Sequence, residues 1–212
     1  MDAKPNSILV LEDDASQLAT LKVLLEDEGL DVTGCSRGTE ALQLLRSNGF
    51  AVAIIDLSLP DISQQQLLDE LAPLSSHIPL IINTGRGSYE SAKTSANLGV
   101  FAFVEKMGDP KELLLKVHKA VHAQAERLAS RALERERERA QIYFEMAGVI
   151  MVAIDKRKKV TSVNKKGAEF LGLDQEHIIG LDWFETFIPE HDRRRVISGF
   201  EDLMAGRIEL AE

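Results

Sequence analysis

The chain has 212 residues, of which 44% are hydrophobic and 28% are charged, and its formal net charge is −9 at pH 7. This acidic balance argues against bulk nucleic-acid binding, and we expect neither a membrane span nor a signal peptide, hence a cytoplasmic protein. The single cysteine, Cys35, excludes a disulfide framework and is expected to be a buried small hydrophobic residue.

Short apolar runs alternate with helical patterns through the first half of the chain. Such runs, bounded by turn residues, predict buried parallel strands at 7–11, 31–35, 51–56, 80–84 and 101–104. The predicted helices are 14–28, 38–47, 64–72, 88–98 and one that opens at Asp109-Pro110. Asp14 is expected to cap the first helix, with Gln17 completing a capping box. This alternation indicates an α/β fold with a doubly wound parallel sheet.

Polar side chains follow four of the predicted strands. They are Glu12 and Asp13, then Asp56, Thr84 and Lys106. The carboxyl ends of parallel strands meet at one edge of a sheet, so we expect these groups to lie together. Carboxylates suit Mg²⁺, Asp56 can attack phosphorus, and a hydroxyl and an ammonium can orient phosphoryl oxygens. Singly, such a lysine is commonly solvated and such a threonine commonly caps a helix; together, the set predicts a phosphoryl-transfer site.

Four segments carry these residues: "ILVLEDD", "AIIDLSLPD", "LIINTG" and "GVFAFVEK". In them, residues 7 to about 122 resemble the receiver domain of two-component response regulators. The resemblance implies a flavodoxin-like sheet in the order 2-1-3-4-5, Mg²⁺ as cofactor and a sensor histidine kinase as partner. The implied site residues are the phosphoacceptor Asp56 with Thr84 and Lys106, the metal ligands Glu12, Asp13, Asp56 and the Ser58 backbone carbonyl, and the switch residue Phe103.

Two positions depart from the family pattern. Met107 stands where receivers usually have proline after a cis bond. A cis bond costs about 2.5–4 kcal/mol before other residues and roughly 0.5–1 before proline, so we expect a trans bond and an altered reach for Lys106. Gln64 stands where glycine is usual, and glutamine takes positive φ only at a cost, so we expect a re-routed loop after Asp56.

A continuous helical pattern follows from Pro110 to about Glu145. It holds near-heptad apolar positions at Leu114, Val117, Val121, Leu128 and Ala132. Residues 134–139 alternate Glu and Arg, which pair along one helix. One interpretation is a single solvated helix between two domains. The one we favour is a parallel two-stranded coiled coil that makes the protein a homodimer, weakened by alanines and Gln124 in the seam.

Residues 138–212 are similar to PAS domains. The resemblance rests on "VIMVAIDKRKKVTSVN", which predicts strands at 149–154 and 160–163, and on "GLDWFETFIPE" before a helix. A PAS domain normally continues into three more strands, so we expect a partial PAS domain within a longer regulator, with a diguanylate cyclase or histidine kinase core as output. A shortened PAS domain is the alternative. The predicted parts are a receiver domain (1–122), a helical linker (110–145) and a partial PAS domain (138–212).

These features predict a two-component response regulator. A histidine kinase would phosphorylate Asp56 with Mg²⁺, and the linker would relay the change to the PAS domain and an output module. It would be a signalling protein rather than an enzyme, catalysing only its own phosphorylation and dephosphorylation, without direct nucleic-acid or membrane binding. One alternative is a phosphatase-like enzyme with Asp56 as nucleophile, which needs a general acid where Ser58 stands. The other is a dimerisation or interaction module with a silent receiver, which the intact acidic set disfavours.

Overall fold

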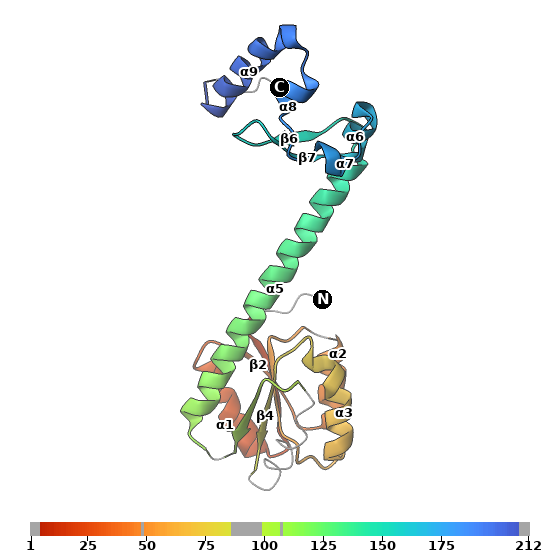
Figure 1. Cartoon of the computed structure of the whole chain (residues 1–212). Helices are drawn as coiled ribbons and strands as arrows, with labels where there is room; N and C mark the ends of the chain where they lie inside the picture. Colours follow the sequence, from red (N-terminus) through yellow and green to blue (C-terminus); the bar gives the residue numbers. More distant parts are fainter. Residues whose placement is uncertain (1–4, 48, 86–98, 107, 208–212) are drawn as a thin grey trace. The chain divides into compact units, whose positions relative to one another are not determined.

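The computed structural model describes residues 5–47, 49–85, 99–106 and 108–207 (Figure 1). The chain forms two compact units, Met1–Arg131 and Ala132–Glu212. The helix predicted at 88–98 and the peptide bond before Met107 lie outside the described residues.

The first unit is built on a parallel sheet. Its strands are β1 (Ser7–Leu11), β2 (Asp31–Cys35), β3 (Val52–Ile55), β4 (Leu80–Thr84) and β5 (Ala102–Glu105). They lie in the order β2-β1-β3-β4-β5, with every pair parallel, as predicted. β1, β3 and β4 are buried along their whole length, because helices cover both faces of the sheet.

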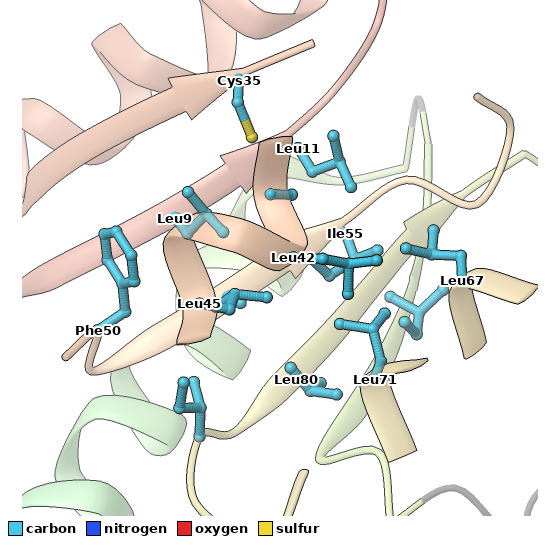
Figure 2. Close-up of a cluster of buried hydrophobic side chains, with 14 of the residues drawn as sticks. Leu9, Leu11, Cys35, Leu42, Leu45, Phe50, Ile55, Leu67, Leu71 and Leu80 are labelled. Atoms are coloured by element: carbon cyan, nitrogen blue, oxygen red, sulfur yellow. The ribbon is translucent and has the colours of Figure 1, made fainter. Parts of the chain in front are cut away.

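Of the described helices of this unit, two cover each face of the sheet. α2 (Gly38–Ser47) and α3 (Gln64–Ser75) lie on one face, and α1 (Ala15–Glu26) and the first part of α5 (Pro110–Met146) lie on the other (Figure 1). Figure 2 shows the core under the first pair, which includes Leu9, Leu11, Leu42, Leu45, Ile55, Leu67, Leu71 and Leu80. This packing holds the carboxyl ends of the strands in fixed positions.

The helix starts explain two local predictions. The Asp14 side chain accepts hydrogen bonds from the backbone N–H groups of Ser16 (2.8 Å) and Gln17 (2.9 Å), so the predicted cap of α1 is confirmed. α3 begins with a capping box between Ser63 and Gln66. Gln64 therefore lies inside a capped helix and needs no positive φ, since Lys158 alone among the described non-glycine residues has one.

α5 is one continuous helix, but its apolar residues have a different use from the predicted one. Val117 has no exposed surface, and Leu114 and Val121 pack with it against the sheet. Val117 belongs to the core of the first unit, and Leu114 and Val121 are partly buried against that core, so assigning Val117 to a coiled-coil seam was wrong. Gln124 is also buried there and donates to the backbone carbonyl of His77 at 2.7 Å, and Arg127 donates to the neighbouring carbonyl of Ser76. From residue 132 to 143 the helix is exposed.

In the described part of the second unit, the end of α5 is followed by a short antiparallel hairpin and four helices. β6 (Val152–Ile154) pairs with β7 (Val160–Val163), followed by α6 (Lys165–Leu171), α7 (Gln175–Ile178), α8 (Trp183–Phe187) and α9 (Glu190–Met204). Val160, Val163, Ala168 and Ile178 form its small core, with Trp183 and Phe187 packed against it. β6 starts three residues later than predicted, because the Asn164 side chain binds the N–H of Met151.

Candidate functional site

Three carboxylates gather at the carboxyl ends of β1 and β3. One oxygen from each of Glu12, Asp13 and Asp56 lies within 4.8 Å of the others. Glu12 and Asp56 are each 1% exposed, whereas Asp13 is exposed to solvent. Carboxylate oxygens with one open side fit a hard divalent cation that keeps part of its water shell, so this donor set fits Mg²⁺.

Lys106 follows β5 and brings its ammonium to the same carboxylates. Its Nζ lies 2.8 Å from Oδ2 of Asp56 and 2.7 Å from Oε2 of Glu12. Burial lowers the pKa of Lys106, but hydrogen bonds and charge interactions with the two carboxylates outweigh it, and the net pKa is raised. Burial raises the pKa of Glu12, even though the Lys106 ammonium acts in the opposite direction. Among the described residues, the ammonium of Lys106 thus contacts two carboxylates of the site.

The remaining predicted residues lie around Asp56. The backbone N–H of Ser58 donates to Asp56 Oδ1 at 3.0 Å. Thr84 ends β4 with no exposed surface, and its hydroxyl has no hydrogen-bond partner in the described part of the chain. Phe103, on β5, is partly buried against the core beneath α2 and α3. The fold therefore brings all the predicted side chains to one edge of the sheet or next to it, while their chemical roles stay predictions.

Sequence reasoning missed the hydrogen bonds by which Asp61, in the loop after Asp56, binds the start of α2. Its carboxylate accepts hydrogen bonds from the N–H groups of Gly38 (3.0 Å) and Thr39 (3.1 Å) and from the Thr39 hydroxyl (2.8 Å). These bonds lower the pKa of Asp61, with the Gly38 bond as the largest cause. A Cβ on Gly38 would lie 2.4 Å from Cγ2 of Ile62, so only glycine allows this close approach. The loop is thereby fixed to the start of α2.

The sequence profile of the response regulator receiver domain matches residues 8–118, just over half of the chain. The chain belongs to this family. The profile of the PAS fold matches residues 118–211. The receiver domain therefore accounts for the sheet and the acidic edge, and the PAS region accounts for the second unit.

Curated relatives match over the receiver domain. The chain is 32% identical to the uncharacterized transcriptional regulatory protein YkoG of Bacillus subtilis (strain 168) over 114 residues, 54% of this chain and 50% of that protein. It is 31% identical to the transcriptional regulatory protein GlrR of Escherichia coli (strain K12) over 125 residues, 59% of this chain and 28% of that protein. The chain thus spans half or less of the length of these relatives.

Solved structures agree. A CheY-like receiver domain from Methanospirillum hungatei JF-1 has a TM-score of 0.53 and 30% identity, over 57% of this chain and 98% of that one. A receiver domain from Clostridium thermocellum has a TM-score of 0.52 and 29% identity, over 56% and 96%. The predicted fold and both resemblances are confirmed, and the chain carries a response regulator receiver domain followed by a PAS region. None of the described helices is long and apolar enough to cross a membrane.

Proposed function

We propose that Asp56 accepts a phosphoryl group from a sensor histidine kinase in a Mg²⁺-dependent reaction. The observation that carries the proposal is the buried Asp56 carboxylate, whose two oxygens have different partners. Oδ1 accepts from the Ser58 N–H at 3.0 Å, and Oδ2 accepts from Lys106 at 2.8 Å. Such a carboxylate is oriented for attack before the phosphoryl group arrives.

The chemistry follows from these positions. A carboxylate oxygen of Asp56 attacks phosphorus, an acyl phosphate forms, and the phosphorus–nitrogen bond to the donor imidazole breaks. The departing imidazole keeps the bond's electron pair and takes a proton. Mg²⁺ held by Glu12, Asp13, Asp56 and the Ser58 carbonyl would neutralise charge on the phosphoryl oxygens. The Lys106 ammonium, 2.8 Å from Oδ2 of Asp56, would contact the same oxygens and stabilise the charge that develops during transfer.

Two residues are suited to report the modification. Phosphorylation adds a charge of about −1.5 to −2 and three strong acceptor oxygens beside Asp56. The Thr84 hydroxyl, which has no described partner, would turn toward those oxygens. Phe103, packed on the neighbouring strand, would then move into the vacated space. α5 follows β5 in the chain and continues into the PAS unit, and this continuity supports α5 as the route of the signal.

Mass spectrometry after incubation with acetyl phosphate and Mg²⁺ tests the proposal. Wild type should gain one hydroxylamine-labile phosphoryl group per chain, and none should form after Mg²⁺ is chelated. Asp56→Asn should gain none, because an amide cannot form the acyl phosphate. Asp69→Asn, which removes an exposed carboxylate on α3, is the matched control and should react like wild type. A labile phosphate on Asp56→Asn would show that the acceptor is another residue.

A further inference from the structure

The buried side chain of Asn164 joins the end of α5 to the rest of the second unit by hydrogen bonds. Asn164 has no exposed surface and uses all its hydrogen-bonding capacity. Its Nδ2 donates to the carbonyls of Phe144 (3.1 Å) and Val149 (2.9 Å), and its Oδ1 accepts from the N–H groups of Met151 (3.0 Å) and Gly167 (2.9 Å). The last helical carbonyls have no partners within a helix, so Asn164 satisfies one that α5 leaves open.

A second contact lies one residue further along α5. The Glu145 carboxylate accepts from the backbone N–H of Lys165 at 2.9 Å and from Nε2 of Gln175 at 3.1 Å. The same Nε2 lies 2.7 Å from the carbonyl of Val163, the last residue of β7. Two consecutive residues of α5 are therefore bound to the residue that follows β7, to the first residue of α6 and to α7.

The receiver end of α5 is held in a different way. There, apolar packing of Val117 and the hydrogen bonds of Gln124 and Arg127 fix the helix to the first unit. The stretch from 132 to 143 between the two attachments is exposed. An intact helix is stiff along its axis, because each turn is hydrogen-bonded to the next. A rotation or shift of α5 is therefore delivered where its last turn is bound.

We infer that Asn164 and Glu145 form a joint that makes the last turn of α5 part of the PAS unit, and that the receiver's signal enters this unit at the β7–α6 junction. The existence of the joint rests on the geometry alone. The entry of the signal at this junction rests on the proposed function. Gly167 supports a close-fitting joint, because a Cβ there would lie 2.7 Å from Cγ2 of Val163 and 3.2 Å from Oδ1 of Asn164.

The sharpest variant is Asn164→Asp. It keeps the oxygen that accepts from Met151 and Gly167, but it loses the donor to Phe144 and Val149 and sets a carboxylate against their carbonyls. Glu145→Ala is the second variant; it removes the other contact and leaves Asn164 intact. Thr161→Val is the matched control, since it removes a β7 side-chain hydrogen bond, to the Ala153 carbonyl at 3.2 Å, that is not part of the joint. Fluorescence of Trp183, the single tryptophan, reports whether the PAS unit remains folded.

Hydrogen exchange of the full chain, without any activator, tests the joint itself. Amides of residues 141–146 and 163–168 should exchange about tenfold faster in Asn164→Asp, the expected effect of losing a pair of hydrogen bonds. Glu145→Ala should show the same pattern more weakly, and Thr161→Val should not. Unchanged exchange at 141–146 in Asn164→Asp and Glu145→Ala would overturn the joint. If Asn164→Asp unfolds the PAS unit, the exchange at 141–146 in Glu145→Ala decides whether the joint exists.

The same measurement with Mg²⁺ and beryllofluoride tests the signal route. In wild type and Thr161→Val, exchange should change around Asp56 and also at 160–168. In the joint variants the change around Asp56 should remain and the change at 160–168 should be lost. The proposed signal route is overturned if the exchange change at 160–168 persists in the joint variants. It is also overturned if wild type shows an exchange change around Asp56 but none at 160–168. If exchange around Asp56 does not change in wild type, the proposed function is refuted. The existence of the joint is then judged from the exchange measured without beryllofluoride.

Discussion

Nζ of Lys106 lies 2.8 Å from Oδ2 of Asp56, although fifty residues separate them in the chain. The same ammonium contacts Glu12, so one cation compensates two carboxylates that are each 1% exposed. Buried charges are stable only when they are paired, so this ammonium stabilises the folded site in addition to the signalling role proposed for it. Its removal should have two separable effects, one on stability and one on signalling.

Lys106→Ala should fold and bind Mg²⁺ but lose the phosphorylation switch. Without the ammonium, Mg²⁺ is the remaining cation for Glu12 and Asp56, so Mg²⁺ should raise the melting temperature of the variant more than that of wild type. The beryllofluoride-induced change near Thr84 and Phe103 should fall to about a tenth of its wild-type size or less. Thermal melts and hydrogen exchange measure the two effects. Lys111→Ala, which removes an exposed lysine, is the control; full activation of Lys106→Ala would remove this residue from the mechanism.

Gly38→Ala should destabilise the receiver domain by about 1–3 kcal/mol, as overpacking usually does. The new Cβ would meet Ile62 at 2.4 Å and Leu59 at 3.0 Å, so α2 and the loop after Asp56 must separate. Chemical denaturation gives the free energy of unfolding. Gly85→Ala is the comparison, because a Cβ there meets nothing within 4 Å. Equal stability of both variants would mean that the loop moves freely away from α2.

The stability contribution of Asp61 should depend on pH in a defined direction. Hydrogen bonds, above all from Gly38, lower its pKa in the folded chain below the ordinary 3.8. A lowered folded pKa means that the contribution is fully present above the unfolded pKa and is lost as pH falls through the folded pKa. Asp61→Asn should therefore be less stable than wild type at pH 7, with the difference shrinking below about pH 4. A difference that grows with acid would contradict the assignment.

Cys35 should be unreactive in the folded chain. Burial, then the nearby Glu40 and Asp61 carboxylates, raise the pKa of its thiol to about 12 from an ordinary 9.0. The thiolate is the nucleophile, so this shift alone lowers its population at pH 8 by about a thousandfold. Alkylation by iodoacetamide, followed by mass spectrometry, should be at least this much slower than in urea. Rapid labelling without denaturant would show that β2 opens locally.

Dimerisation through α5 remains a prediction. The burial of Val117 means that the contact is expected in a later part of α5 than the sequence indicated. Val117 packs inside the receiver domain and Val121 is partly buried against the same core, so we expect a second chain to contact the exposed stretch 132–143. Leu133 and Ala140 lie seven residues apart, on one face within about 20°. Leu133→Glu with Ala140→Glu should convert a sedimenting dimer into a monomer that still binds Mg²⁺, because buried like charges repel.

Two results would contradict this dimer. One is a wild type that sediments as a monomer at tens of micromolar, and the other is a double variant that stays dimeric. Val23→Glu places the same charge on an exposed site of α1 and should not change the oligomeric state.

Local patterns were enough to predict much of the receiver fold. β1, β2 and β4 begin and end at the predicted residues, because each is a short run with turn residues on both sides. The edge that carries Asp56 followed from the rule that the carboxyl ends of parallel strands meet, whereas the order of the strands followed from the family resemblance. The heptad interpretation was wrong at Val117 because the same spacing suits a helix packed on a sheet and a helix packed on another helix.

The missed contacts share one physical cause. Asp61 binds Gly38 and Thr39, more than twenty residues away, and Asn164 binds Phe144, twenty residues away. Each side chain looks like an ordinary turn or cap residue in its own segment. Most of its partners are backbone groups, which no sequence pattern marks. Such contacts become visible only when the chain is folded.

Because α5 is one continuous helix, the number of residues in the linker sets a rotation about the helix axis as well as a length. Each residue added or removed between 132 and 143 turns everything after it by about 100° and displaces it by about 1.5 Å along the axis. A seven-residue deletion nearly restores the original angle, whereas a two-residue deletion reverses the facing side. Receiver domains grafted from other regulators onto this PAS region should therefore work or fail with a helical period, whatever their sequence identity to the native one.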